Sequence, residues 1–433
     1  MNVLLLNQCF HPDVVATAQQ LTDLAVGLVK EGHRVTVVTS DRGYDDPSQS
    51  FPRRETWEGI DIIRIRSLSL GKDARWRRAA SFASFLINCT LKLCTLPRFD
   101  CVVALTSPPL ISLIGSIFVR LRGGRFFFWV MDLNPDEAIA AGWLKENSVT
   151  ARVLSRVLRY SLLRAEKVIA LDHFMKQRLV DKGVAPDRVV VLPPWAHDDT
   201  VRYDEEGRRA FRERHNLTEK FVVMYAGNHS PCHPLDTLLE SARHLSEGDS
   251  KQAVIAFCFI GGGSEQKKVR EFSARHRLEN ILCLPYQPVE MLAASLSAAD
   301  LHTIVMGDRF VGIVHPCKLY NILSVGSPFL YIGPNESHIS EIVERINDNY
   351  GAYSANSDDV KTVVGHILAE ARLKPRRTQM AVSEVANAFS RSTLLPRMIA
   401  LFKTPALAES QDSPQMAQRN TEMNNKEIGQ SAS

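Results

Sequence analysis

Apolar and polar residues alternate along this chain in two different rhythms. Short apolar runs, beginning with Val3–Leu6, have the length of buried strands. Between them lie segments such as Ala18–Lys30, whose apolar residues recur at the spacing of one helical face. Gly32 follows that segment directly and can end a helix in the left-handed conformation. The alternation predicts β-α units whose strands assemble into a parallel sheet.

The alternation runs through the chain twice. In the first series we expect further strands at Arg34–Thr39, Ile60–Arg66, Cys101–Leu105, Phe126–Met131, Lys167–Leu171 and Val189–Leu192, with helices at Arg75–Leu93, Leu110–Leu121, Ala151–Leu163 and Phe174–Lys182. The second series has strands at Phe221–Tyr225, Val254–Ile260, Ile281–Leu284, Leu301–Val305 and Pro328–Ile332, with helices at Leu235–Leu245, Ser264–His276, Pro288–Leu296, Lys318–Val325 and Ser337–Arg345. The sequence therefore predicts an α/β protein with two Rossmann-like, doubly wound parallel-sheet domains that face a central cleft.

The two series define the expected domains. We predict an N-terminal Rossmann-like domain over residues 1–195 and a C-terminal one over residues 196–385. The linker is expected at Pro193-Pro194-Trp195 and the polar stretch to about Arg209. A helix over residues 386–403 could pack back on the N-terminal domain. Residues 404–433 hold almost no large apolar side chain and are expected to form a disordered tail.

Composition narrows the class of protein. Hydrophobic residues make up 45% and charged residues 23%, as in ordinary soluble globular proteins. No apolar stretch approaches the roughly 20 residues that span a bilayer, and the start of the chain has neither the basic region nor the cleavage site of a signal peptide. The 8 cysteines form no CxxC pair, which favours reduced thiols over disulfides or a zinc site. We therefore expect a cytoplasmic protein.

Basic residues are concentrated in the N-terminal half, most densely over residues 53–78 and 120–188. Two interpretations are open: an anionic partner such as a membrane surface or a lipid phosphate, or ordinary solvated charge. Arg75–Arg78, with Trp76 among arginines, opens the apolar stretch Ala79–Cys94. That pattern is typical of an interfacial membrane contact or of the charged start of a buried helix. We expect no nucleic-acid partner.

Loops that follow strands are the candidate ligand sites, because open α/β sheets bind ligands at the carboxyl ends of their strands. Asn7–Asp13 offers free backbone N–H groups before the first helix but lacks GxGxxG, so a dinucleotide is poorly supported. In Tyr225–Pro234, Gly227 allows close backbone approach, and His229 and His233 flank a helix start. That segment suits a phosphate or a plain turn. Pro234 fits a first helical turn.

Two further loops of the second series carry weaker indications. Gly261-Gly262-Gly263 indicates a ligand close to the backbone or a tight βα turn, and Ser264 could cap the next helix. In the loop Leu284–Pro288, Tyr286 and Gln287 could hold a nucleobase, although a simple turn also explains them.

The loop and short helix over Gly312–Pro328 are the most informative. His315 and Lys318 lie where the helix begins, and a helix N-terminus with a fixed cation suits a diphosphate. Asn321, one turn later, shares the helix face of Lys318 and could bond a ribose hydroxyl. Lys318 could equally be a surface lysine. Gly326 can cap the helix end.

In the N-terminal half, Asp132, Asp136 and Glu137 follow a very apolar strand. They could face the cleft as an acid/base group or hydroxyl acceptor, or cap the next helix. Thr106–Pro109 ends another strand and could line the same cleft.

Taken together, these segments resemble the GT-B glycosyltransferases, specifically family 4 and its branch in bacterial surface-polysaccharide assembly, over roughly residues 1–400. The resemblance is carried by the order and spacing of Phe10-His11-Pro12, Gly32–Thr39, Thr106–Pro109, Asp132–Asp136, Tyr225–Asn228 and Pro316–Pro328.

The resemblance implies a retaining transfer in polysaccharide biosynthesis from a nucleotide-sugar, with a UDP-sugar favoured, to a lipid-linked or saccharide acceptor. It implies no cofactor and no bound metal, an acceptor-binding N-terminal domain, a donor-binding C-terminal domain, and a cytoplasmic enzyme that could work at the inner face of the plasma membrane. On this template the catalytic residues are Asp132 and Lys318. The donor-binding residues are Gly227, Asn228, His233, Gly261, Tyr286, Gln287, His315, Pro316, Lys318, Leu319 and Asn321, and the acceptor side comprises Phe10, His11, Thr106 and Asp136.

The chain departs from the family pattern at three places. Ile313 and Asn321 stand where the family usually has glutamates, and Ser230-Pro231 stands where related branches often carry an arginine. Three functions are therefore open from the sequence: an active glycosyltransferase, a catalytically silent relative that acts as a binding or assembly subunit, and a nucleotide-sugar epimerase.

Overall fold

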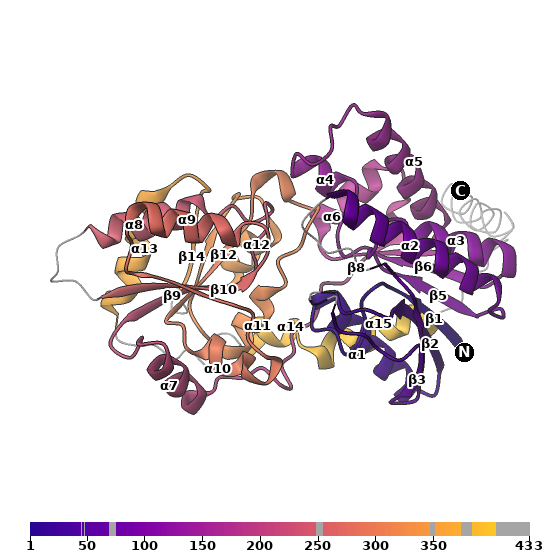
Figure 1. The fold of residues 1–433 in the computed structure, drawn as a ribbon, viewed down its shortest axis with the longest axis horizontal. Coiled ribbons are helices and arrows are strands. Elements are labelled where there is room, and N and C mark those ends of the chain that lie inside the picture. The colour runs from indigo at the N-terminus through magenta and orange to yellow at the C-terminus, as the bar shows by residue number, and fades with distance from the viewer. Residues whose placement is uncertain are drawn as a thin grey trace, which may run out of the picture. The chain divides into compact units, whose positions relative to one another are not determined.

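The strands of the N-terminal half form one sheet in the order β3-β4-β2-β1-β5-β6-β7-β8 (Figure 1). The computed structural model describes residues 1–44, 46, 48–68, 75–247, 254–346, 351–373 and 383–403, so the tail expected over 404–433 lies outside it. The strands are β1 (Asn2–Leu6), β2 (Arg34–Ser40), β3 (Arg54–Trp57), β4 (Ile60–Ile65), β5 (Cys101–Ala104), β6 (Arg125–Trp129), β7 (Lys167–Ala170) and β8 (Val189–Val191). Every described pairing is parallel except that of β3 with β4.

Helices cover both faces of this sheet. They are α1 (Ala16–Lys30), α2 (Arg75–Cys94), α3 (Ile111–Arg122), α4 (Asp136–Ala140), α5 (Val149–Arg164) and α6 (His173–Asp181), with a 3₁₀ turn η1 (Pro186–Arg188). α1 packs on β2 and β4, whereas α3 packs on β5 and β6 and contacts α2 and α5. Figure 1 shows α1 on one side of the sheet and α2 with α3 on the other. Gly32 ends α1 with a φ of 78°, as the sequence predicts.

The second sheet is wholly parallel in its described pairings, in the order β11-β10-β9-β12-β13-β14. Its strands are β9 (Phe221–Asn228), β10 (Ile255–Gly262), β11 (Ile281–Leu284), β12 (Leu301–Val305), β13 (Phe329–Ile332) and β14 (Ala352–Ala355). The helices are α7 (Glu205–Arg214), α8 (Asp236–Ser246), α9 (Gln266–His276), α10 (Leu292–Ser297), α11 (Lys318–Val325), α12 (His338–Arg345) and α13 (Val360–Arg372), with 3₁₀ turns η2 (Val289–Met291) and η3 (Asp308–Phe310).

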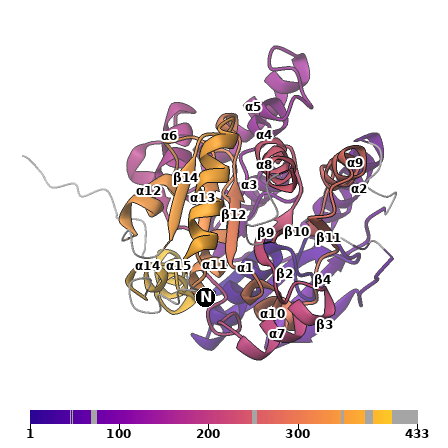
Figure 2. The ribbon, with the colours of Figure 1, turned by 90° about the vertical axis from the view of Figure 1, so that its left-hand side faces the viewer.

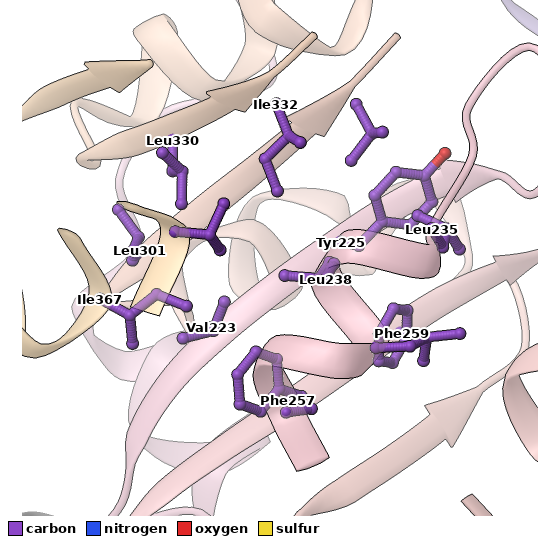
Figure 3. Close-up of a cluster of buried hydrophobic side chains, with 14 of the residues drawn as sticks. Val223, Tyr225, Leu235, Leu238, Phe257, Phe259, Leu301, Leu330, Ile332 and Ile367 are labelled. Carbon is purple, nitrogen blue, oxygen red and sulfur yellow. The ribbon is translucent and has the colours of Figure 1, made fainter. Parts of the chain in front are cut away.

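Alternate residues of β9 point into two separate cores, because successive side chains of a strand face opposite sides of the sheet. Val223 and Tyr225 join the core beneath α8 and α13, which lie beside each other in Figure 2 and supply Leu238 and Ile367 (Figure 3). Val222 and Met224 point to the opposite core, which α7 supplies with Phe211. Burial on both faces explains why these strands are apolar throughout.

The structure confirms the predicted α/β class with two parallel sheets but differs in its less apolar parts. The sequence analysis overlooked β3 and β14, which are edge strands with partly exposed residues and therefore lack a continuous apolar run. Helix α7 begins at Glu205, inside the stretch expected to be linker. Its charged sequence is held by Asp204, which caps the helix, and by ion pairs of Arg208 and Arg212 with Asp300.

Two smaller expectations about helix starts were wrong. Glu265, not Ser264, precedes the first residue of α9, and no side chain caps that helix. Pro234 lies before α8, which begins at Asp236. In both places the strand runs on further than the apolar residues indicate, because Gly227-Asn228 and Gly261-Gly262 continue the pairing of β9 with β10.

The chain passes between the two sheet domains along two neighbouring segments. The first follows β8, and the second lies between α14 (Ser383–Ala388) and α15 (Arg391–Lys403). They meet where the backbone N–H of Ala196 donates to the carbonyl of Phe389 at 2.8 Å. Asp23 of α1 accepts from both segments, from Trp195 Nε1 at 2.8 Å and from Arg391 Nη1 at 2.9 Å. Both crossings are therefore anchored to the same helix.

Substitution of Gly261 tests the close pairing between the ends of β9 and β10. Its φ is +135°, and a Cβ there would lie 2.0 Å from the carbonyl oxygen of Gly227. Gly261→Ala is therefore expected to lower the free energy of unfolding by about 2–4 kcal/mol, measured by urea denaturation. The matched control is Gly365→Ala in α13, where a Cβ meets open space; it should raise stability by about 0.5–1 kcal/mol. Equal effects at both sites would contradict this account.

Candidate active site

A shielded lysine ammonium lies at the start of α11. Lys318 Nζ is 3.6 Å from the centroid of the Tyr225 ring. A Cβ on Gly227 would lie 3.4 Å from that nitrogen, so the lack of a side chain at Gly227 leaves room for the Lys318 ammonium. Within the described residues, Nζ is shielded from solvent and has no hydrogen-bond partner. Burial lowers the pKa of Lys318 to about 7. A buried cation that lacks an acceptor in the protein suits an anionic ligand.

Two histidines beside Lys318 are neutral at pH 7. Burial and the charge of Lys318 lower the pKa of His229 to about 4 and that of His233 to about 3. Nδ1 of His229 lies 3.0 Å from the carbonyl of Gly227, and Nδ1 of His233 lies 2.7 Å from the carbonyl of Val305. A carbonyl accepts, so each ring carries its proton on Nδ1 and presents Nε2 as an acceptor. The two rings can therefore accept hydrogen bonds from hydroxyl groups of a ligand through Nε2, but they cannot donate from that atom to phosphate oxygens.

An exposed aromatic ring lies next to the ends of β9 and β10. Tyr286 is 49% exposed, and a Cβ on Gly262 would lie 3.0 Å from its ring. Asn228 lies at the end of β9 and is exposed. The side-chain amide of Gln287 donates to the carbonyl of Pro285, two residues earlier, at 3.0 Å. These residues form a surface beside the Lys318 ammonium on which a planar base can stack.

Other residues predicted to bind the donor have partners within the protein. The ring of His315 bonds Asp172 Oδ2 at 2.8 Å and the hydroxyl of Tyr320 at 2.5 Å. Asn321 Oδ1 accepts from the backbone N–H of His197 at 3.3 Å. The side chains of Pro316 and Leu319 are buried, so only their backbone atoms can face a ligand.

On the N-terminal domain, Asp132 follows β6 and is half-buried. Burial and the charge of Glu137 raise the pKa of Asp132 to about 8, so the carboxyl is largely protonated at neutral pH. Burial raises the pKa of Cys317, the residue before Lys318, and Asp132 lies close enough to raise it further when its carboxyl is ionised. The two predicted catalytic residues thus reach one region from different domains.

The remaining acceptor-side residues lie around the ends of β1, β5 and β6. Thr106 Oγ1 accepts from the backbone N–H of Asp132 at 3.4 Å, and Asp136 pairs with Lys182 at 2.6 Å. The ring of His11 stacks on Trp57 of β3 with centroids 3.9 Å apart. Phe10 is buried and supports the loop from beneath.

Asp172, two residues after the end of β7, forms a buried cluster with two histidines that the sequence analysis overlooked as a set. Asp172 Oδ2 lies 2.8 Å from Nδ1 of His315 and 3.4 Å from Nδ1 of His338. The two rings stack with centroids 3.8 Å apart. In the described part of the chain, this is the group whose ligand atoms have metal-binding spacing. Parallel stacked rings do not direct both lone pairs at one ion, so the cluster fits a structural role better.

A cavity of about 670 Å³ lies away from all these residues. It is formed at the amino ends of β1 and β2 beside the end of α2, and its lining includes Asn2, Arg34, Arg54 and Arg98. None of the predicted site residues lines it. The region of Lys318 and Asp132 is the candidate active site, because the shielded ionisable groups gather at the carboxyl ends of the strands there.

Comparison with known proteins bears on the fold and the class of protein. Residues 16–195 match the family model of the glycosyl transferase 4-like domain. The chain is 21% identical over 411 residues to the putative colanic acid biosynthesis glycosyl transferase WcaI of Escherichia coli K12, covering 92% of this chain and 99% of WcaI. It is 23% identical over 247 residues to the probable glycosyltransferase WbjE of Pseudomonas aeruginosa, covering 57% and 60% of the two chains. The solved structure of Anabaena HepE in complex with UDP and glucose superposes with a TM-score of 0.69 at 14% identity, covering 93% of this chain and 99% of HepE.

Fold and matches together define the class: this protein is a glycosyltransferase of the GT-B fold. Its residues 16–195 are a glycosyl transferase 4-like domain. The resemblance drawn from the sequence is confirmed.

The Asp172 cluster predicts a pH dependence of stability. Burial raises the pKa of Asp172, but the bond from His315 and the neighbouring His338 outweigh it and lower that pKa to about 2. A depressed carboxyl pKa stabilises the fold above the unfolded value of 3.8, and that stability is lost as the pH falls through 2. The group contributes about 2 kcal/mol at neutral pH, of which about half is lost by pH 3.

The measurement is urea denaturation of the wild type and Asp172→Asn from pH 6 to pH 3. The stability difference between the two proteins should shrink as the pH falls. Asp181→Asn, an exposed aspartate at the other end of α6, controls for the loss of one charge. A difference that stays constant down to pH 3 would show that Asp172 is not held in this way.

Proposed function

We propose that the protein is a retaining, metal-independent glycosyltransferase that moves a sugar from a UDP-sugar to a lipid-linked or saccharide acceptor in polysaccharide biosynthesis. One observation carries the proposal: Lys318 Nζ is shielded at the start of α11, over Tyr225 and beside Gly227, with no acceptor among the described residues. A donor diphosphate would supply that acceptor.

Charge stabilisation at Lys318 accounts for the chemistry. When the bond between the sugar and the diphosphate breaks, negative charge develops on the leaving UDP. Lys318 and the free N–H groups at the start of α11 lie where they can stabilise that charge. A metal ion performs the same task in other transferases, so an adequate protein cation supports a metal-independent reaction.

The state of Asp132 supports retention of configuration without a covalent intermediate. With its pKa raised to about 8, Asp132 is mostly protonated at pH 7, and a protonated carboxyl is a poor nucleophile. It can instead donate a hydrogen bond to a sugar or acceptor hydroxyl. The acceptor hydroxyl then attacks from the side that the leaving diphosphate vacates, and its proton passes to an oxygen of that diphosphate as the sugar–oxygen bond to UDP breaks.

The choice of a UDP-sugar and of polysaccharide biosynthesis rests on the relatives. HepE has been solved with UDP and glucose, and WcaI is named for colanic acid biosynthesis. In this chain the exposed ring of Tyr286, beside the glycines that end β10, offers a stacking surface for the uracil.

Lys318→Ala should weaken UDP binding by roughly 10- to 150-fold, measured by isothermal titration calorimetry, because it removes a charge-assisted bond worth about 1.5–3 kcal/mol. In the wild type, Kd should rise about three- to tenfold per pH unit above pH 7, as free Lys318 loses its proton while the UDP phosphate stays ionised. The variant should lose this pH dependence, and EDTA should change neither protein.

Lys267→Ala is the control, because that side chain is 83% exposed on α9 and pairs with Glu271 on the same helix. It should bind UDP like the wild type. Unchanged affinity in Lys318→Ala would remove the observation on which the proposal rests. A wild type that binds UDP only with added divalent metal would contradict metal independence alone.

Contact with an anionic membrane is part of the proposal, because a lipid-linked acceptor is presented there. Ile87 and Leu91 of α2 and Ile117 and Leu121 of α3 are all at least 40% exposed, and the two helices contact each other. Each pair is spaced by one turn and so lies on one exposed face of its helix, and Arg120 and Arg122 are exposed beside Leu121. Apolar side chains among arginines suit the interface of an anionic bilayer. Among the described residues, no helix has the length and hydropathy to cross a membrane.

The double variant Leu91→Ser, Leu121→Ser should bind vesicles of phosphatidylcholine with 30% phosphatidylglycerol at least about fivefold more weakly than the wild type, by co-sedimentation. Wild-type binding should fall steeply with added salt, because the arginine contribution is screened. Val254→Ser, a similarly exposed residue on the C-terminal domain, is the control. Equal binding by all three proteins, or binding insensitive to salt, would leave the arginines as ordinary solvated charge.

A further inference from the structure

The segment Val311–His315, which leads into α11, is fastened to α6 of the other domain. Arg178 Nε donates to the carbonyl of Val311 at 2.7 Å. Gly312 has a φ of +68°, and a Cβ there would lie 2.7 Å from the backbone of Phe174 in α6. His315 bonds Asp172, which also caps α6 by accepting from the N–H of Met175. One short helix thus holds the segment along its whole length.

The same segment fixes the loop that carries Asp132. The backbone N–H of Leu133 donates to the carbonyl of Ile313 at 2.9 Å. Leu133 follows Asp132 directly, and Lys318 follows the segment by three residues. The contact is made by the backbone of Ile313, whose side chain is buried. The position of the Asp132 loop relative to Lys318 therefore depends on Val311–His315.

We propose that Arg178 is a positioning residue that, by holding the Val311 carbonyl, keeps Lys318 and Asp132 in register for transfer. The inference rests on the proposed donor site at Lys318. Arg178 itself touches neither residue and acts through Val311–His315. Its bond is charge-assisted and short, and it joins residues 133 apart in the sequence.

Among the contacts that hold Val311–His315, the bond of Arg178 can be removed with the least disturbance to the rest of the structure. Loss of Asp172 would remove a helix cap and leave two buried histidines beside no charge. Loss of Gly312 would force a side chain into the backbone of α6. Arg178→Ala removes one bond and leaves those contacts in place. It therefore changes the hold on the segment without a large change in the core.

The first experiment measures hydrogen exchange at the backbone N–H of Leu133, which needs no substrate. Exchange there reports whether the Leu133–Ile313 bond opens. In Arg178→Ala, the N–H of Leu133 should exchange at least roughly tenfold faster than in the wild type. The substitution releases Val311–His315, and Ile313 in that segment accepts the hydrogen bond from Leu133. The matched control is Arg188→Ala, since Arg188 also donates to a backbone carbonyl, that of Leu163, but within one domain. It should leave Leu133 unchanged.

The second experiment separates binding from turnover. In Arg178→Ala, UDP affinity should stay within about threefold of the wild type, because Lys318, Tyr225 and Gly227 belong to one domain. Release of UDP from UDP-glucose should show kcat lowered about tenfold or more with little change in KM, because misplaced reacting groups cost rate rather than binding. A general structural defect would instead weaken UDP binding and speed exchange at many amides.

The outcomes are distinguishable. Wild-type exchange at Leu133 in Arg178→Ala overturns the positioning role, whatever UDP does. A wild type that does not bind UDP overturns the proposed donor site, while the Leu133 result still decides whether Arg178 holds the segment. If Arg178→Ala does not fold, Arg178→Gln, which keeps one N–H donor and most of the apolar stem, is compared with Arg188→Gln by the same two measurements.

Discussion

The proposed active site depends on one buried charge, the ammonium of Lys318. A lysine loses free energy when it leaves water, and its lowered pKa is the sign of that cost. The surrounding structure is arranged so that the cation is tolerated yet left without an acceptor: Tyr225 lies beneath it, Gly227 presents no side chain, and His229 and His233 stay neutral beside it. The buried ammonium therefore lowers the stability of the free protein, and a bound anion would offset that loss.

Most of the fold could be predicted from the sequence because its central strands are buried on both faces. Such strands as β9 and β12 are apolar throughout and stand out from the amphipathic helices between them. The edge strands β3 and β14 did not stand out, since water reaches one side of them. Helix α7 was taken for linker because capping and ion pairs, which depend on the distant Asp300, hold it rather than an apolar stripe.

The site was predictable only as far as it follows strand ends. Asp132 and Lys318 were singled out because one follows β6 and the other starts the helix after a strand-end loop, and Asp172, two residues after the end of β7, was available by the same reasoning. The tasks of His315 and Asn321 could not be predicted, because their partners Asp172 and His197 come from elsewhere in the chain. Arg178 lies inside a helix and bonds a carbonyl 133 residues away, a relation that no local pattern reveals.

The paired crossings at Ala196 and Phe389 have a mechanical consequence. The two segments of chain are bonded to each other, and both are tied to Asp23 of α1. Independent sliding or twisting would break the bond between them. Any movement that leaves these three bonds intact must therefore carry the two crossings and α1 together.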